Sequence, residues 1–343
     1  MRRAGFIVIG RTNMTEFAYS GLGLNPHYGT PKNPFDRAAG RIPGGSSSGA
    51  AVSVADGMAA AAIGTDTGGS CRIPAAFCGV VGFKPTARRV SLRGVLPLAP
   101  SLDSVGPLAP SVTCCAHVDA ILSGGAPAPI EDRRPGGLRI AVLRNYVLDG
   151  MDSTVAEVFE SALSTLSAAG VALTDIVLPD LDSLPALNAK GGLVAAEAFA
   201  WHRERLDKAE DAYDPRVAAR IARGREQSAA DYIDLLAERR RMIQNAGERT
   251  AVYDAVLFPT VPVVAPTIAA MAEDTAYMRA NGLVLRNSTV ANMLDRCAIS
   301  IPLAPHGAAP IGLTLMGEHG EDRKLFSVAR TVERLVSGDR NQI

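Results

Sequence analysis

Apolar residues are spaced along the chain in two ways that predict alternating strands and helices. Residues 138–143 form a short, mostly apolar run of the kind found in buried strands, and residues 171–177 form another. Between them, residues 155–169 place apolar side chains at helical spacing. This strand–helix–strand order favours a layered α/β sheet. Similar patterns predict two more short strands, a largely helical stretch and a closing helix, at 256–258, 311–315, 190–250 and 322–335.

Further apolar segments lie near the N-terminus. Residues 4–10 are almost continuously apolar, so we expect a strand that is buried on both faces in a parallel sheet. Residues 50–56 are small and mostly apolar and suit a packed helix, while residues 59–63 suit a buried strand. A central strand that starts three residues after Met1 suggests that an upstream segment of the domain is missing.

The bulk composition excludes several classes of protein. Hydrophobic residues make up 47% of the chain and charged residues 20%, which is typical of a folded protein. Lys plus Arg equals Asp plus Glu at 35 each, so charge gives no reason to expect nucleic acid or an anionic membrane as a partner. The five cysteines form no C-x-x-C pair and the five histidines lack metal-ligand spacing, so we expect neither a disulfide framework nor a metal. Without a signal peptide or an apolar run of about 18 residues, a reducing cytoplasm is expected.

Two glycine-rich loops carry serines that could do chemistry, at 44–49 and 64–72. A nucleophilic serine needs an exposed Oγ, a proton acceptor, and donors aimed at the developing oxyanion. Glycines before Ser70 let the backbone turn sharply. They also leave the N–H groups of Thr67, Gly68, Gly69 and Ser70 bare enough to be those donors. The P-loop and dinucleotide-binding patterns are both absent here. A pair of structural turns is the alternative interpretation of either loop alone.

Together with their flanks, the two loops resemble the amidase signature family. Ser46 and Ser70 are 24 residues apart, which is the family's spacing. Ser48 stands where the family usually has glycine. The resemblance implies a single amidase domain over residues 1–343, with an α/β/α layered fold and a central twisted mixed sheet. The matching segments span nearly the whole chain, at 10–17, 44–47, 64–70, 72–75, 82–86, 258–262 and 299–302.

The resemblance also implies roles for both serines. Ser70 would be the nucleophile that forms an acyl-enzyme, and Ser46, at a cis peptide bond, would relay its proton to a neutral lysine. No cofactor is implied, and the substrate would be a small carboxylic amide that is not a peptide. From the residues themselves, we expect Asp66 and Ser47 to support the nucleophile loop by hydrogen bonds, and Arg72 to anchor it.

The family's catalytic lysine has no counterpart in this chain. It lies farther upstream than the 45 residues that precede Ser46. Lys84 matches a non-catalytic Lys-Pro-Thr segment of the family, Lys32 lies in a turn-rich loop, and Arg11 could not act as a base at neutral pH. Two explanations stay open: a domain that lacks its N-terminal segment, and a naturally lysine-free, inactive paralogue.

The main hypothesis is therefore an amidase that acts through a Ser-Ser-Lys type mechanism, with the lysine absent from this chain. One alternative is the A subunit of a tRNA-dependent amidotransferase, which would need partner subunits. Another is a non-catalytic remnant of an amidase. The sequence also leaves a homodimer open.

Overall fold

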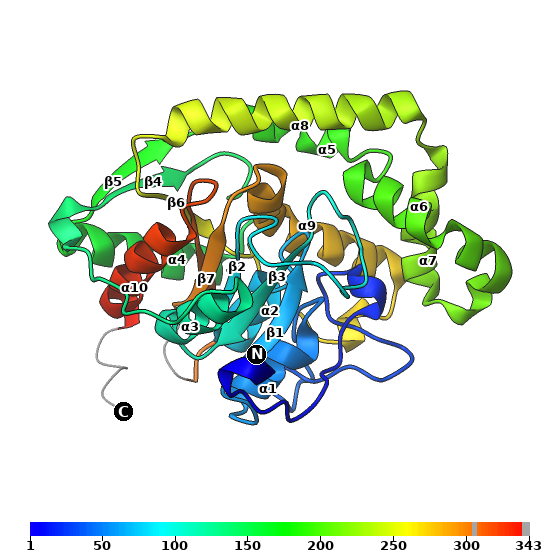
Figure 1. The fold of residues 1–343 in the computed structure, drawn as a ribbon, viewed down its shortest axis with the longest axis horizontal. Coiled ribbons are helices and arrows are strands. Elements are labelled where there is room, and N and C mark those ends of the chain that lie inside the picture. The colour runs from blue at the N-terminus through cyan, green and yellow to red at the C-terminus, as the bar shows by residue number, and fades with distance from the viewer. Residues whose placement is uncertain (304–306, 338–343) are drawn as a thin grey trace.

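The computed structural model describes residues 1–303 and 307–337 and contains an eight-stranded sheet (Figure 1). The strand order is β1-β3-β2-β7-β8-β6-β4-β5. Strand β4 pairs in parallel with β5 and β6, and the other neighbours pair antiparallel, so the predicted mixed sheet is confirmed. The strands are β1 Ala62–Asp66, β2 Val81–Lys84, β3 Ser104–Ala109, β4 Arg139–Leu143, β5 Ala172–Ile176, β6 Ala255–Pro259, β7 Ala298–Pro302 and β8 Gly312–Met316.

Helices cover both faces of the sheet, as the predicted α/β/α layering requires. Helices α3, α4 and α10 pack on one face, and α8 and α9 pack on the other. In Figure 1, α8 runs along one side of the molecule, far from α3 and α10. The helices are α1 Ser48–Ala55, α2 Arg72–Cys78, α3 Val112–Leu122, α4 Ser153–Ala168, α5 Leu184–Leu187, α6 Gly192–Ala209, α7 Pro215–Ala222, α8 Ala229–Thr250, α9 Asp274–Met293 and α10 Asp322–Ser337.

Strands β4 and β6 are almost continuously apolar because both of their faces are buried. In β4, Ile140 and Val142 join the hydrophobic core beneath α4 and α10, while Ala141 and Leu143 join the core beneath α8 and α9. Successive side chains of a strand point to opposite faces, so two cores need an unbroken apolar run. This confirms the predicted elements from residue 138 onward, to within a few residues at their ends.

The N-terminal segment is where the sequence prediction is wrong. Residues 4–10 form no strand: Arg2–Ala4 is a short 3-10 turn, and the residues after it have no regular structure. Ile7 is 86% exposed and Ile9 is 70% exposed. A strand needs the backbone of a neighbour, and among the described residues no strand pairs with this segment.

The predicted strand at 59–63 is also shifted. It begins at Ala62 and forms β1, an edge strand that pairs only with β3 within the described residues. Ile63 is 44% exposed, so β1 is not the buried strand that its sequence indicated. Among the helices that the structure describes, none has the length and apolar character that crossing a membrane demands.

Candidate active site

The first serine loop precedes α1 and is fully buried. Its Gly45–Ser46 peptide bond is cis, as the resemblance implies. The Ser46 carbonyl accepts hydrogen bonds from the amides of Thr15 (3.1 Å) and Ser48 (2.8 Å). The Ser46 hydroxyl is buried, and it has no hydrogen-bond partner among the described residues. The loop is thus fixed by its backbone and leaves one polar side chain free for chemistry.

The second serine loop connects β1 to α2. Gly69 has φ of 123°, and a Cβ at this position would collide with the hydroxyl of Ser288 on α9. Only glycine therefore fits at the residue before Ser70. The amide of Ser47 donates to the carbonyl of Ser70 at 3.2 Å. This hydrogen bond joins the two serine loops, so the structure brings both predicted serines to the same place.

A buried ion pair holds the second loop. The carboxylate of Asp66 accepts from the amides of Gly69 (2.9 Å) and Cys71 (3.1 Å), and the guanidinium of Arg72 donates to both of its oxygens at 2.9 and 3.0 Å. Burial alone would raise the pKa of Asp66, but the Arg72 charge and the hydrogen bonds from Arg72 and Asn292 keep that pKa below its usual value. Asp66 is therefore ionised and stabilises the loop through its hydrogen bonds rather than acting as a general base.

The same loop has backbone N–H groups that could receive an oxyanion. The amides of Thr67, Gly68 and Ser70 donate to no acceptor within the described part of the chain, whereas the amide of Gly69 donates to Asp66. The Thr67 hydroxyl donates to a carboxylate oxygen of Asp103 at 2.5 Å, which fixes the loop from its other side. Of the predicted oxyanion donors, Gly69 is already engaged.

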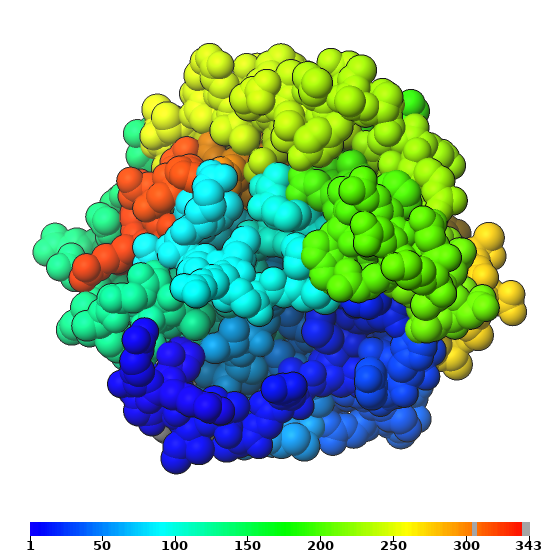
Figure 2. Space-filling model, turned by 45° about the vertical axis from the view of Figure 1, so that its right-hand side comes forward, coloured from blue at the N-terminus to red at the C-terminus, as the bar shows by residue number. Residues whose placement is uncertain are grey.

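Ser70, Thr67 and Gly68 line a cavity of about 520 Å³. The cavity lies among the N-terminal loop, the loop before β3, α6, α7 and α9. Figure 2 shows three of these regions meeting on one face: the N-terminal loop in blue, the loop before β3 in cyan and α6–α7 in green. The lining is largely apolar, and among the described residues it includes no Asp or Glu but three arginines, Arg220, Arg223 and Arg286.

None of the described lysines reaches the hydroxyl of Ser46. Lys84 is fully buried, but its amine donates to the carbonyls of Pro85 (2.9 Å) and Arg296 (2.7 Å). Burial lowers the pKa of Lys84 to about 8, yet these contacts give it a structural role, in line with its non-catalytic motif. Lys190 and Lys324 form ion pairs elsewhere.

Sequence reasoning missed the supports that α9 supplies. The Ser288 carbonyl accepts from Arg72 at 2.8 Å, and the Ser288 hydroxyl donates to the Gly68 carbonyl at 2.7 Å. The side-chain NH2 group of Asn292 donates to the Asp66 carboxylate at 3.0 Å. These residues follow the loop by more than 200 positions and stand in no motif, so no local signal marks them.

Metal ligands do not gather at this site. Within residues 1–303 and 307–337, no group of three or more His, Cys, Asp or Glu side chains could hold a metal ion. His306 lies outside the described residues.

A family model supplies the deciding observation: the model described as Amidase matches residues 1–326. The chain belongs to the amidase family. This amidase is 36% identical over 338 residues to 2-amino-5-chloromuconic acid deaminase of Comamonas testosteroni, an alignment that covers 96% of this chain and 72% of that protein. It is also 34% identical to the A subunit of the glutamyl-tRNA(Gln) amidotransferase of Halobacterium salinarum, over 96% of this chain and 85% of that protein.

A solved amidase structure confirms the fold of this amidase. The crystal structure of an amidase superposes with a TM-score of 0.88 at 33% identity, covering 98% of this chain and 76% of that one. The predicted fold class and the predicted family are therefore both confirmed. Members of the family are hydrolases of C–N bonds that act on small amides, which supports the amidase hypothesis over a fold shared by chance.

Proposed function

We propose that this amidase hydrolyses the C–N bond of a small amide with Ser70 as its nucleophile. One observation carries the proposal: the hydrogen bond from Ser47 to Ser70 sets the nucleophile loop directly beside the buried Ser46 loop, where Ser70 opens on the 520 Å³ cavity. A cavity that buries most of a small ligand and presents one nucleophile is suited to acyl transfer.

The proposed mechanism combines this arrangement with the roles that the family resemblance implies for Ser70 and Ser46. The Oγ of Ser70 attacks the amide carbonyl carbon while its proton passes to Ser46. The amides of Thr67 and Gly68, with that of Ser70 itself, stabilise the tetrahedral oxyanion. The C–N bond then breaks, the leaving nitrogen takes up the proton, and an ester of Ser70 remains. Water attacks this acyl-enzyme, releases the carboxylic acid and restores the Ser70 hydroxyl.

Proton relay through Ser46 requires an acceptor beyond it. A neutral amine suits this role, because it can take the proton and later return it to the leaving nitrogen. No described lysine accepts from Ser46, so this chain's own turnover depends on whether a base reaches that hydroxyl. An inactive protein with an intact nucleophile loop is the alternative.

Intact-mass measurement after exposure to a fluorophosphonate tests the nucleophile. We expect the parent chain to gain the mass of one probe and Ser70→Ala to gain none. Ser53→Ala is a matched control, because Ser53 lies on α1 and its hydroxyl donates only to the Ala50 carbonyl. It should label like the parent. No label on a folded parent, or labelling of Ser70→Ala, would show that Ser70 is not an activated nucleophile.

The amidotransferase A subunit is the second candidate, and the similarity to the Halobacterium salinarum protein favours it. Such a protein would elute with partner chains, whereas a free amidase would elute alone or as a homodimer. Size-exclusion chromatography with light scattering, on the protein taken from its native cells, separates these outcomes. The five free cysteines fit a reducing compartment, and we propose the cytoplasm.

A further inference from the structure

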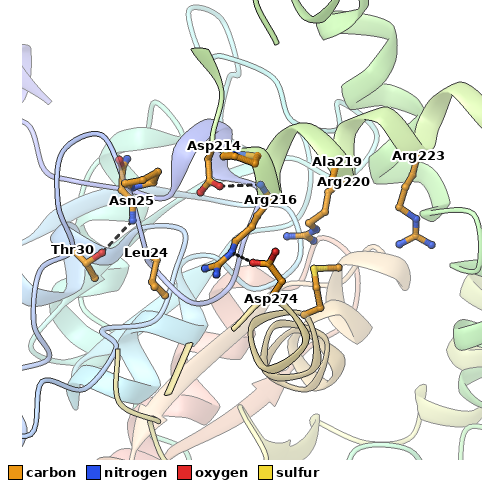
Figure 3. Close-up of a pocket in the computed structure, with 12 residues that line it drawn as sticks. Leu24, Asn25, Thr30, Asp214, Arg216, Ala219, Arg220, Arg223 and Asp274 are labelled. Carbon is orange, nitrogen blue, oxygen red and sulfur yellow. Dashed lines mark hydrogen bonds and ion pairs between the residues drawn. The ribbon is translucent and has the colours of Figure 1, made fainter. Parts of the chain in front are cut away.

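Two arginines at the end of α7 stand at the boundary of two adjoining cavities. Arg220 and Arg223 line both the cavity that contains Ser70 and a neighbouring cavity of about 610 Å³. They are three residues apart, which places them on the same side of the helix. Figure 3 shows both side chains projecting from that side of α7. Both side chains therefore lie where the two cavities adjoin.

Neither guanidinium is neutralised by an acid within the described part of the chain. Arg220 donates to the Tyr19 carbonyl and lies over the Tyr19 ring, 4.3 Å from its centroid. Arg223 donates to the Ala189 carbonyl. By contrast Arg216, one turn earlier on α7, is paired with Asp274 at 2.7 Å (Figure 3). A single carbonyl uses only part of a guanidinium's donors, so Arg220 and Arg223 have both charge and N–H groups to offer.

Arg286 also lines the Ser70 cavity, but its donors are committed. It donates to the side chain of Asn287 and to the carbonyls of Asp149 and Val147. These bonds fix Arg286 to the loop after β4. Its charge adds to the positive potential of the cavity, while Arg220 and Arg223 are the residues that can bind a group directly.

We propose that the cavity takes an amide that also carries a carboxylate, with the carboxylate held by Arg220 and Arg223 and the amide carbon at Ser70. Two guanidinium groups on the same side of one helix end offer N–H donors to the two oxygens of a carboxylate. The rest of the cavity lining is rich in apolar side chains, including Leu98, Leu102 and Leu193, and suits a short hydrocarbon linker. The position of the amide carbon at Ser70 rests on the proposed function, whereas binding of the carboxylate by the two arginines does not.

Calorimetry with the Ser70→Ala variant measures binding without turnover, so it tests the anion site separately from the reaction. The probes are the monoamides of succinic, glutaric and adipic acid, each compared with the neutral diamide of the same length. We expect Ser70→Ala to bind the best monoamide acid about ten- to a hundredfold more tightly than its diamide, as for charge-assisted hydrogen bonds. Adding Arg220→Met or Arg223→Met should remove most of this preference.

Arg225→Met is the matched control, because Arg225 is an exposed arginine in the same segment that pairs with Asp207 outside both cavities. It should keep the full preference. Equal affinity for the acids and the diamides, or an equal loss in Arg225→Met, would overturn the inference.

Turnover by the unaltered chain then tests the proposed function separately. Preferential binding of the acids without hydrolysis would contradict the amidase activity and leave the anion site standing. Equal hydrolysis of acids and diamides would contradict the anion site and leave the amidase activity standing.

Discussion

Asp66 and Arg72 form a fully buried ion pair, and the second serine loop, which contains Ser70, folds around it. Taking two charges out of water is costly, and the cost is offset only when their hydrogen bonds are satisfied. Here Asp66 accepts from two loop amides and from Asn292, while Arg72 also donates to the Ser288 carbonyl. The pair thus specifies the shape of the loop more than it adds to overall stability.

Replacing Arg72 by methionine keeps most of the side-chain volume but leaves the Asp66 carboxylate buried and uncompensated. We expect the free energy of unfolding to fall by about 3–5 kcal/mol, measured by urea denaturation. The surface pair of Arg225 and Asp207 gives the comparison, since Arg225→Met should cost less than about 1 kcal/mol. A similar small loss for both variants would contradict the role of the buried pair.

Glu333 on α10 predicts a pH dependence. Burial raises the pKa of Glu333 to about 7, and its carboxyl accepts from the Val112 amide at 2.9 Å. The folded chain therefore holds this proton more tightly than the unfolded chain, so stability falls as the pH rises from about 4.5 to 7 and is level above that range.

Glu333→Gln should remove this part of the slope and raise stability above pH 7 by about 1–3 kcal/mol, measured by urea denaturation from pH 4.5 to 8. Glu157→Gln, an exposed change on α4, should leave the slope unchanged. If stability still falls with pH in Glu333→Gln, other groups cause the pH dependence.

At the scale of single residues, the sequence predicted Asp66, Arg72 and Ser47 as the loop's supports because they stand within or beside it. It could not predict Ser288 and Asn292, which the fold brings from α9. It also expected the Gly69 amide as a free donor, but the Asp66 carboxylate occupies that amide at 2.9 Å. Residues adjacent in sequence can be judged from their loop, whereas a partner from a distant helix depends on tertiary packing.

At the scale of elements, the N-terminal apolar segment and strand β1 share one property. Residues 6–9 are apolar and exposed, and β1 has a neighbour only on its β3 side within the described residues. Exposed apolar chain and an unpaired strand edge both favour association between molecules. The prediction of a strand at 4–10 failed because apolar sequence indicates a preference for burial, while strand formation also needs a partner backbone.

Placing charge on this segment should reduce self-association. We expect Ile7→Lys with Ile9→Lys to lower the fraction of aggregated protein, measured by light scattering at equal concentration. Val177→Lys is a control at another exposed apolar position, 51% exposed after β5, and should have a smaller effect. Unchanged aggregation in the double variant would mean that the N-terminal segment does not drive association.

At the scale of the whole molecule, the sheet lies between two hydrophobic cores and contributes side chains to both. Strands β4 and β6 contribute alternate side chains to both cores, so loss of either core would disrupt the sheet that supports the other. We therefore propose that residues 1–343 fold as a single domain. The mixed sheet and its layers were predictable, because alternating strand and helix patterns survive small errors at element ends.

Single-domain folding predicts one cooperative transition. Trp201, the chain's only tryptophan, lies on α6, which Figure 1 shows on the opposite side of the molecule from β4, β5 and α4. Its fluorescence and the far-UV circular dichroism should therefore change at the same urea concentration. Two separated midpoints would instead mean that the α6–α7 region unfolds independently.

The link between α9 and the nucleophile loop also bears on the order in which the protein matures. A ribosome releases the chain from its N-terminus, so both serines emerge long before Ser288 and Asn292. Until α9 has been synthesised, Arg72 lacks the Ser288 carbonyl and the Asn292 side-chain oxygen to which it donates. Asp66 likewise lacks the hydrogen bond from the Asn292 side chain. A nascent or prematurely ended chain would thus contain the complete glycine–serine motif without the folded loop around Ser70. The proposed nucleophile would therefore form only after α9, residues 274–293 of 343, has been synthesised.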